Sequence, residues 1–433
     1  MLLVTILLLT FSLITTKDCN NNSSKTSVVK SRSYNELDHK VKTVQNDLNN
    51  LFKKTNEIDL KYHIHVNKLN DMIANILIRL NSTKYNTVCS SCDSSLLKIS
   101  KKHNSYIKNI LTGHRNDVWT IVELKNGDLA TGSTDPKIIV WDAQTGNIKH
   151  KLIGHRKDVN ELLVLPNGDL ASASADFSVI IWDVEIGKVK FNLTGHLDQA
   201  WPLLSLPNGD LASGSFDGSI IIWDTKSGVL KYRLLGHRNV VTVLKLLPNS
   251  DIISGSRDGR MIIWDSLNGK LKNIFQGSHH FITTLYVLSD DTIVSGSIDG
   301  IIKIWYMNNG TIKSLLYGHR TGISTFKLLE CNQLASASAD GLIIIWDLNT
   351  SEIKHKLIGH TEIVWSLELL NNGYLASASL DADIIIWNTK NGTLKTRLSG
   401  HNHSVQQLKL LSNGDMASVS RDGTIIIWDT LFL

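Results

Sequence analysis

A 41-residue repeat governs the second part of this chain. Gly-His dipeptides recur every 41 residues from Gly113, and a tryptophan recurs with the same period from Trp141 to Trp428. The period holds through eight units without an insertion, and Gly277-Ser278 fills the one gap in the Gly-His series. A period near 40 with Gly-His and Trp-Asp marks indicates a unit of about four short strands, the blade of a propeller.

The residues between these marks favour the same architecture. Each periodic tryptophan ends an apolar run such as residues 343–346, which is typical of a strand buried on both faces. Asn-Gly dipeptides join two apolar runs in five units and predict hairpins. On these motifs, residues 105–433 resemble the WD-repeat β-propeller family. We therefore expect an all-β, eight-bladed propeller.

The end of the chain indicates how the ring closes. Trp428 is followed by only five residues, so the eighth unit lacks its outer strand. Residues 105–112 fit this place. An N-terminal strand paired beside the strand that ends at Trp428 would remove an open sheet edge.

Each unit repeats a set of residues that imitates a catalytic triad. An Asp stands six residues before each tryptophan, with hydroxyl residues two and four positions before that Asp. Nucleophilic catalysis needs one exposed Ser with an oxyanion hole, whereas the same set in nearly every unit indicates a structural device. In similar WD-repeat proteins these residues form a hydrogen-bonded network, and the resemblance leaves open which hydroxyl takes part. In the fifth unit Ser278 replaces the His, so we expect an incomplete network there.

The expected network residues are His114, His155, His196, His237, His319, His360, His401, Asp135, Asp176, Asp217, Asp258, Asp299, Asp340, Asp381, Asp422, Trp141, Trp182, Trp223, Trp264, Trp305, Trp346, Trp387 and Trp428. The sequence contains no HExxH motif and no GxxxxGK[ST] phosphate loop. We therefore predict a protein that is not an enzyme and has no cofactor or metal site. A hydrolase is the third alternative, and it would need an exposed Ser-His pair beside a pocket in one blade.

The residues left after the repeat is subtracted are the candidates for binding. Three tryptophans outside the periodic series share one repeat position, just after the first strand of a unit begins. Aromatic and Arg residues also occur immediately before the turn Asp, where a turn does not require them, and such residues are typical interface anchors. The candidate partner-binding residues are Trp119, Trp201, Trp365, Phe216, Arg257, Phe281 and Arg421. The alternative is that the three tryptophans pack between neighbouring loops.

Ring order sharpens this hypothesis. Units 7, 8 and 1 are neighbours in a closed ring, so Trp365, Arg421 and Trp119 are expected to form one arc. An Arg flanked by aromatic residues suits an acidic or phosphorylated peptide. Arg257 would be a separate contact on the opposite side.

The charge distribution argues against nucleic acid as a partner. Residues 17–112 contain 16 Lys/Arg and 8 Asp/Glu, a net charge of +8. The remainder contains 29 Lys/Arg and 32 Asp/Glu, a net charge of −3. The sequence pI of 8.8 therefore reflects the leading segment, and the propeller has no overall basic character.

The leading segment divides into four parts. Residues 1–16 are uncharged and predict a cleaved signal peptide, with an uncleaved anchor or a non-targeting apolar start as alternatives. A polar linker follows over residues 17–36. Residues 37–80 are expected to form a coiled-coil stalk, or else a single amphipathic helix lying on the other domain. The apolar seam is Leu37, Val41, Val44, Leu48, Leu51, Ile58, Tyr62, Leu69, Met72 and Ile76.

Residues 81–104 form a second linker that contains Cys89 and Cys92. If the chain is secreted, interchain disulfides are plausible at this pair.

The whole sequence predicts a scaffold that binds peptide segments of other proteins on the top face of the propeller and associates with itself through the stalk. We expect it to be secreted or membrane-anchored, with membrane contact only if the leader is retained. The alternative is a cytoplasmic regulatory protein that reads phosphorylated or acidic peptides.

Overall fold

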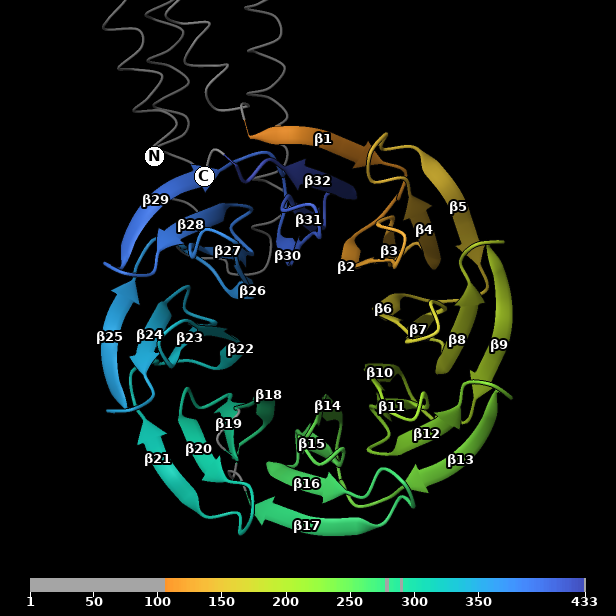
Figure 1. Ribbon diagram of the computed structural model, residues 1–433, viewed down its shortest axis with the longest axis horizontal. Helices are drawn as coiled ribbons and strands as arrows, with labels where there is room; N and C mark the ends of the chain where they lie inside the picture. Colours follow the sequence, from red (N-terminus) through yellow and green to blue (C-terminus); the bar gives the residue numbers. More distant parts are fainter. Residues whose placement is uncertain (1–105, 277–279, 289–290, 432–433) are drawn as a thin grey trace, which may run out of the picture. The chain divides into compact units, whose positions relative to one another are not determined.

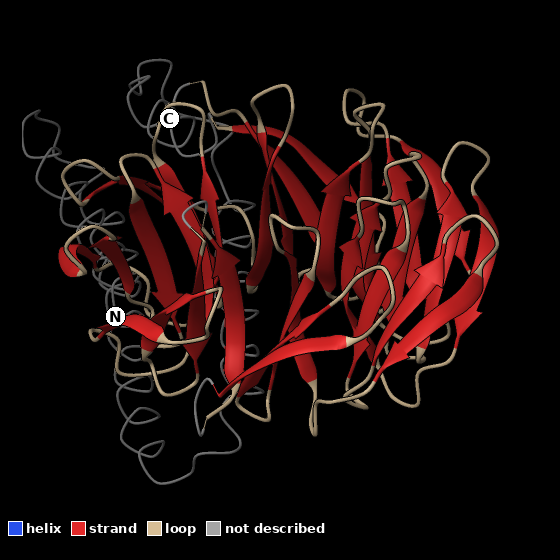
Figure 2. Ribbon diagram, turned by 60° about the horizontal axis from the view of Figure 1, so that its bottom comes forward, coloured by secondary structure: helices blue, strands red, loops and turns tan. Residues whose placement is uncertain are grey.

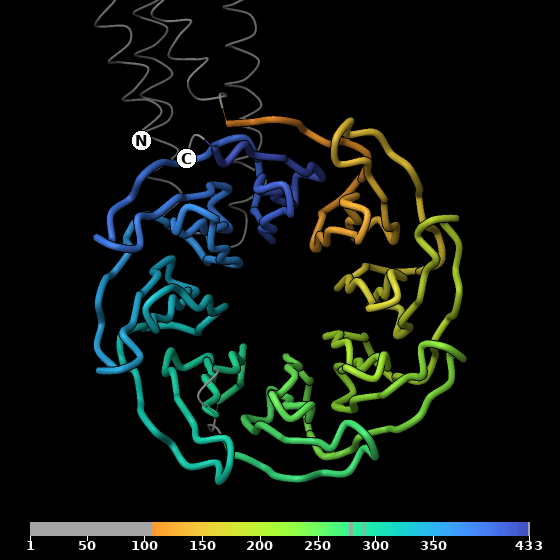
Figure 3. The backbone as a smooth tube through the Cα atoms, in the orientation of Figure 1, coloured from red at the N-terminus to blue at the C-terminus, as the bar shows by residue number. Residues whose placement is uncertain are grey.

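The propeller is seen in a computed structural model that describes residues 106–276, 280–288 and 291–431. The described residues form eight four-stranded antiparallel sheets, arranged as blades around a central axis (Figures 1 and 3). The expected all-β, eight-bladed propeller is confirmed. The expected leader (1–16), polar linker (17–36), stalk (37–80) and CxxC linker (81–104), together with Ser278, lie outside the described residues.

Each blade has an inner, a second, a third and an outer strand. The inner strands are β2 (Val118–Glu123), β6 (Val159–Val164), β10 (Ala200–Ser205), β14 (Val241–Leu246), β18 (Ile282–Val287), β22 (Ile323–Leu329), β26 (Val364–Leu369) and β30 (Val405–Leu410). The second strands are β3 (Leu129–Ser133), β7 (Leu170–Ser174), β11 (Leu211–Ser215), β15 (Ile252–Ser256), β19 (Thr292–Ser297), β23 (Gln333–Ser338), β27 (Leu375–Ser379) and β31 (Met416–Ser420). The third strands are β4 (Lys137–Trp141), β8 (Ser178–Asp183), β12 (Ile220–Asp224), β16 (Arg260–Trp264), β20 (Ile302–Tyr306), β24 (Ile343–Asp347), β28 (Ile384–Asn388) and β32 (Thr424–Trp428). The outer strands are β5 (Ile148–Ile153), β9 (Lys188–Thr194), β13 (Val229–Leu234), β17 (Leu271–Gln276), β21 (Ile312–Leu316), β25 (Glu352–Leu357), β29 (Thr393–Leu398) and β1 (Ile107–Thr112).

The eighth blade combines the two ends of the propeller sequence. Strand β1 pairs antiparallel with β32, with Ile107 opposite Trp428 and Thr112 opposite Thr424. Within β1, Leu111 is 2% exposed and belongs to the core between blades 8 and 1, whereas Ile110 points outward and is 48% exposed. The first and last strands of the propeller therefore share one sheet.

The core lies between the blades. One hydrophobic cluster occupies each of the eight interfaces between neighbouring blades. The second and third strands, which are buried on both faces, supply most of its residues, and the inner and outer strands supply the rest. Burial of one Val, Leu or Ile side chain contributes about 1.5–3 kcal/mol. The continuously apolar runs that precede each tryptophan are the sequence signal of this burial. Each blade is therefore stabilised by both of its neighbours.

The loops gather at the two faces of the ring, as Figure 2 shows. Because the strands alternate in direction, the turn between the second and third strands lies at the same face as the loop that enters the inner strand. We call this the top face. A backbone hydrogen bond joins the two segments in every blade, for example from Arg421 N to Ser404 O at 3.0 Å. Among the described residues, no helix is long and apolar enough to span a bilayer.

Candidate functional site

The repeated polar residues form a chain of hydrogen bonds inside the blades. In blade 2, Trp182 Nε1 donates to Ser172 Oγ at 2.7 Å, and Ser172 Oγ lies 2.7 Å from His155 Nε2. His155 Nδ1 lies 3.1 Å from Asp176 Oδ2. In the tautomer with its proton on Nδ1, His155 donates to Asp176 and accepts from Ser172 at Nε2.

The structure distinguishes the two hydroxyls that the sequence left open. The residue four positions before Asp accepts the indole N–H in all eight blades. The residue two positions before Asp acts at the turn: Ser174 Oγ accepts from Asp176 N at 3.0 Å and donates to Lys157 O at 3.2 Å. Ser172 is completely buried, so it cannot reach a substrate in the position of a nucleophile.

The Asp at the end of the chain is held ionised. Burial opposes the charge of Asp176, but hydrogen bonds from His155, Ser178 and the Arg156 N–H outweigh it and hold the pKa of Asp176 below its ordinary value. Asp217, Asp258 and Asp422 have lowered pKa values for the same combination of reasons. The carboxylate thus fixes the loop after Gly-His to the turn before the third strand.

Blade 6 departs from this arrangement, which the sequence did not indicate. His319 Nε2 still lies 2.7 Å from Ser336 Oγ, but within the described part of the chain its buried Nδ1 has no hydrogen-bond partner. Asp340, the expected partner, is exposed and accepts from Leu342 N at 3.0 Å. Burial lowers the pKa of His319 to about 4, although the charge of Asp340 opposes this change.

In blade 5, Trp305 keeps its bond to Ser295, while the buried Ser297 Oγ has no partner among the described residues.

At the top face, Arg421 stacks on Trp119. The guanidinium carbon of Arg421 lies 4.8 Å from the centre of the Trp119 ring, so the contact joins blades 8 and 1. Arg421 Nε is buried and has no hydrogen-bond partner in the described regions. Asp117 Oδ2 lies 3.6 Å from it and forms an ion pair with Arg421 that is too long for a hydrogen bond. The guanidinium therefore retains hydrogen-bonding capacity.

A second cluster forms around Arg257. Its guanidinium carbon lies 5.6 Å from the ring centre of Phe216 and 6.0 Å from that of Phe281. These residues come from blades 3, 4 and 5, and Phe281 is 40% exposed. The structure thus brings together five of the seven candidate binding residues in two clusters. For the other two, Trp201 and Trp365, no contact with either cluster is found among the described residues.

The three extra tryptophans interrupt a series of bonds between blades. At this repeat position, Asn160, Thr242, Thr283 and Ser324 each donate to a carbonyl oxygen of the next inner strand, as Thr242 does to Ile282 O at 2.7 Å. No corresponding bond from Trp119, Trp201 or Trp365 is found in the described segments. Trp365 is 37% exposed, and the other two are half-buried.

Eight segments of the chain match the family model "WD domain, G-beta repeat". The matched residues are 105–142, 146–183, 187–224, 228–265, 269–306, 310–347, 351–388 and 392–429. The chain belongs to the WD-repeat family. The expected resemblance is therefore confirmed, and proteins of this family generally act as non-enzymatic scaffolds that bind other proteins.

Solved structures agree with this assignment. The WD-repeat chain is similar to the computationally designed Ika8 protein, with 28% identity, a TM-score of 0.68, and coverage of 75% of this chain and 99% of that one. It also has the fold of the WD40 β-propeller domain of Doa1, with 22% identity, a TM-score of 0.53, and coverage of 75% and 97%. No curated protein sequence matches the chain.

The inner strands of this WD-repeat propeller carry a second kind of contact between blades. Glu161 Oε2 accepts from Leu203 N at 2.8 Å, and Gln407 Oε1 accepts from Ile121 N at 2.9 Å in the same way. Burial raises the pKa of Glu161 to about 7, while the Leu203 N–H and the charge of Lys245 act in the opposite direction. The carboxyl and amide side chains thus perform the same structural task at different blades.

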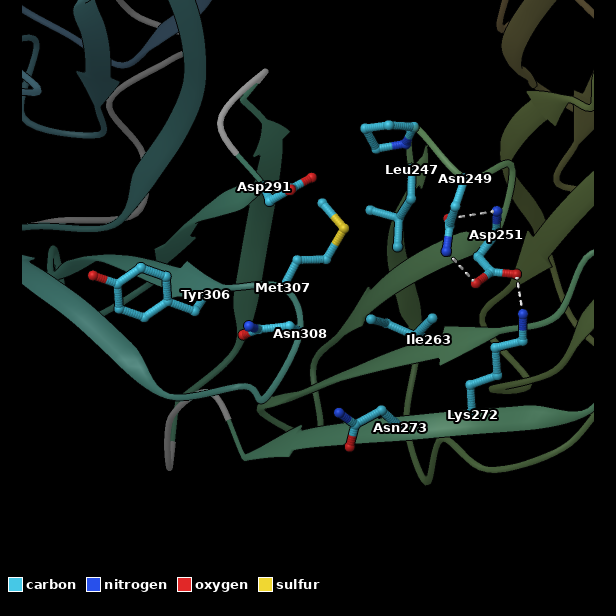
Figure 4. Close-up of a pocket in the computed structure, with 11 residues that line it drawn as sticks. Leu247, Asn249, Asp251, Ile263, Lys272, Asn273, Asp291, Tyr306, Met307 and Asn308 are labelled. Atoms are coloured by element: carbon cyan, nitrogen blue, oxygen red, sulfur yellow. Dashed lines mark hydrogen bonds and ion pairs between the residues drawn. The ribbon is translucent and has the colours of Figure 1, made fainter.

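The face opposite the two Arg clusters contains a pocket of about 520 Å³ between blades 4 and 5 (Figure 4). Among its polar residues, Asp251 accepts hydrogen bonds from Asn249 and from Lys272. Across the described ranges, no group of three or more His, Cys, Asp or Glu residues could hold a metal ion.

Sequence reasoning missed one exposed aromatic residue of the top face. Phe177 follows the turn Asp of blade 2, where five other blades have Gly. The ammonium of Lys157 lies 5.3 Å from the centre of its ring, and Phe177 is 39% exposed. The Asp-Phe dipeptide in place of Asp-Gly was the available signal.

Proposed function

We propose that this WD-repeat protein is a scaffold whose top face binds acidic or phosphorylated peptide segments of partner proteins, with Arg421 and Trp119 at the centre of the site. The observation that carries the proposal is the partly exposed guanidinium group of Arg421 over the ring of Trp119. The scaffold role itself is general in the family, and the choice of peptide and of face is our proposal.

The chemistry of the Arg421 guanidinium group favours an anionic ligand. The Arg421 side chain is 30% exposed, so the outer part of its guanidinium group is open to a ligand. Carboxylates and phosphates form the strongest hydrogen bonds with guanidinium groups. Asp117 contributes nearby negative charge, but its 3.6 Å separation from Arg421 Nε leaves the hydrogen bond unmade.

The Arg257 cluster supports a second contact point for the same partner. The Arg257 guanidinium carbon lies within 6.0 Å of the ring centres of both Phe216 and Phe281, and Arg with aromatic residues is typical of interface anchors. It is separated from Arg421 along the ring, so a long peptide or two segments of one partner would be needed to occupy both. The alternative for the extra tryptophans, packing between neighbouring loops, is consistent with the half-buried Trp119 and Trp201 but not with the 37% exposure of Trp365.

The test is peptide selection on the purified full chain. A random dodecapeptide phage library is panned on the parent, and the affinities of enriched synthetic peptides are measured by fluorescence anisotropy. We expect enrichment in Asp and Glu, with at least tenfold weaker binding to Arg421→Gln. The matched control is Lys226→Gln, an equal charge change at an exposed turn of the opposite face. Equal affinities for the two variants would refute the site, and phosphoserine versions of the peptides distinguish phosphate from carboxylate recognition.

We also propose that the segment before the propeller determines location and valency. Cleavage near Thr16 would make the chain extracytoplasmic, and a coiled coil over residues 37–80 would convert weak single contacts into avidity. Intact mass of the protein from its native host tests the first idea, because a retained Met1 contradicts cleavage. Light scattering of the full chain tests the second, because a monomer contradicts a self-associating stalk.

A further inference from the structure

The turn after Asp176 has a backbone conformation that favours Gly, yet it contains Phe177. Phe177 has a φ of 75°, close to the 78–81° of the glycines at the same position in blades 3, 4, 5, 6 and 8. Those glycines are Gly218, Gly259, Gly300, Gly341 and Gly423. A positive φ is unfavourable for a bulky side chain, so Phe177 strains the turn.

Crowding adds to this strain. A Cβ at Gly218 would lie 3.2 Å from two carbonyl oxygens of the loop that enters the next blade, and one at Gly300 would lie 2.8 Å from such an oxygen. By repeat symmetry, the turn of blade 2 faces the loop of blade 3 that contains Leu197. Leu197 is 80% exposed and stands where blades 1, 2, 4 and 6 have Arg.

Burial does not compensate for these costs. Phe177 belongs to none of the eight hydrophobic clusters and remains 39% exposed. Its aromatic ring contacts the ammonium of Lys157, which is itself on the surface. A strained, exposed aromatic residue at the rim of a propeller is better explained by binding than by folding.

The position of blade 2 connects this residue to the two Arg clusters. In ring order, the Arg421 cluster lies on blades 8 and 1, Phe177 and Lys157 lie on blade 2, and the Arg257 cluster lies on blades 3 to 5 (Figure 1). We infer that Phe177, with Leu197, binds an aliphatic or aromatic side chain of the same peptide, while Lys157 pairs with an adjacent acidic residue. This inference rests on the proposed function, and it adds a specificity for an apolar residue next to an acidic one.

The experiment compares two substitutions at the same turn position. Phe177→Gly and Ala382→Gly both place Gly at a positive φ, since Ala382 has a φ of 71°. Relief of strain is expected to raise the apparent unfolding midpoint of both variants, by about 1–3 °C. The probes are the dodecapeptides enriched on the parent chain and their versions with the apolar residue replaced by Ala.

Only Phe177→Gly is expected to bind the enriched peptides at least fivefold more weakly, and the apolar-to-Ala peptides are expected to bind the parent and Phe177→Gly equally. Unchanged affinity in Phe177→Gly would overturn the inference, as would a lower unfolding midpoint, because the side chain would then serve folding. If Arg421→Gln still weakens binding in that case, the proposed function stands without this residue. If neither substitution weakens binding, the proposed function fails as well.

Discussion

Ser172 Oγ and His155 Nε2 lie 2.7 Å apart inside blade 2, and the same oxygen accepts the indole N–H of Trp182. Ser172→Ala would leave two buried polar groups without their partner, so we expect a loss of about 2–4 kcal/mol in the free energy of unfolding. Urea denaturation measures it. Ser227→Ala, at an exposed turn, is expected to change stability by less than about 0.5 kcal/mol. Similar values for both would contradict the bracing role of the network.

The position of β1 as the outer strand of blade 8 is tested by substitutions at two neighbouring residues of that strand. Leu111→Ala removes a side chain that is 2% exposed in the core between blades 8 and 1, and we expect a loss of about 2–4 kcal/mol. Ile110→Ala removes one that is 48% exposed, so its expected effect is below about 1 kcal/mol. Equal losses in urea denaturation would show that β1 does not occupy the outer place of blade 8.

His319 gives the propeller an acid-sensitive point. Its folded pKa of about 4 lies below the unfolded value of 6.5, so the unfolded chain binds the extra proton first as the pH falls. The contribution of His319 to the free energy of unfolding is fully retained above pH 6.5. It decreases by up to about 3 kcal/mol as the pH falls from 6.5 to 4. Urea denaturation at several pH values is expected to show a shallower decrease in His319→Gln. His360→Gln, which retains His319, keeps the steeper decrease if this account is correct.

Glu161 has the opposite pH dependence. Its folded pKa of about 7 exceeds the unfolded 4.5, so stability is highest below pH 4.5 and is lost as the pH rises to 7. Gln407 makes the same contact without charge, so Glu161→Gln is expected to stabilise the protein by about 1–2 kcal/mol above pH 7. Gln407→Glu is the reverse experiment. A gain from Glu161→Gln of the same size at pH 4 and pH 8 would contradict ionisation as the cause.

The sequence predicted the blades because their signals are local. A tryptophan at the end of an apolar run and an Asp six residues earlier predict a buried third strand and its turn. This prediction does not depend on which residues the neighbouring blade contains. The clusters of the top face depend on side-chain direction across blades, which periodicity does not contain. The sequence placed Arg257 apart from Trp119 and Arg421 and in one candidate set with Phe216 and Phe281, but only the structure shows that the three residues are in contact. The exposure of Asp340 likewise has no counterpart in its sequence motif.

Phe177 illustrates a different limit. Its signal was present as Asp-Phe in place of Asp-Gly, but the significance of the substitution depends on the positive φ and on the carbonyl oxygens that a Cβ meets at this position. A residue that departs from the repeat can be interpreted only when the backbone conformation at its position is known.

A crystal structure of the full chain with an enriched acidic peptide tests the central claim most directly. We predict a carboxylate or phosphate oxygen of the peptide within hydrogen-bonding distance of the Arg421 guanidinium, with the peptide backbone over Trp119 on the top face. A peptide bound to the opposite face or along the outer strands, without contact with Arg421, would contradict the account.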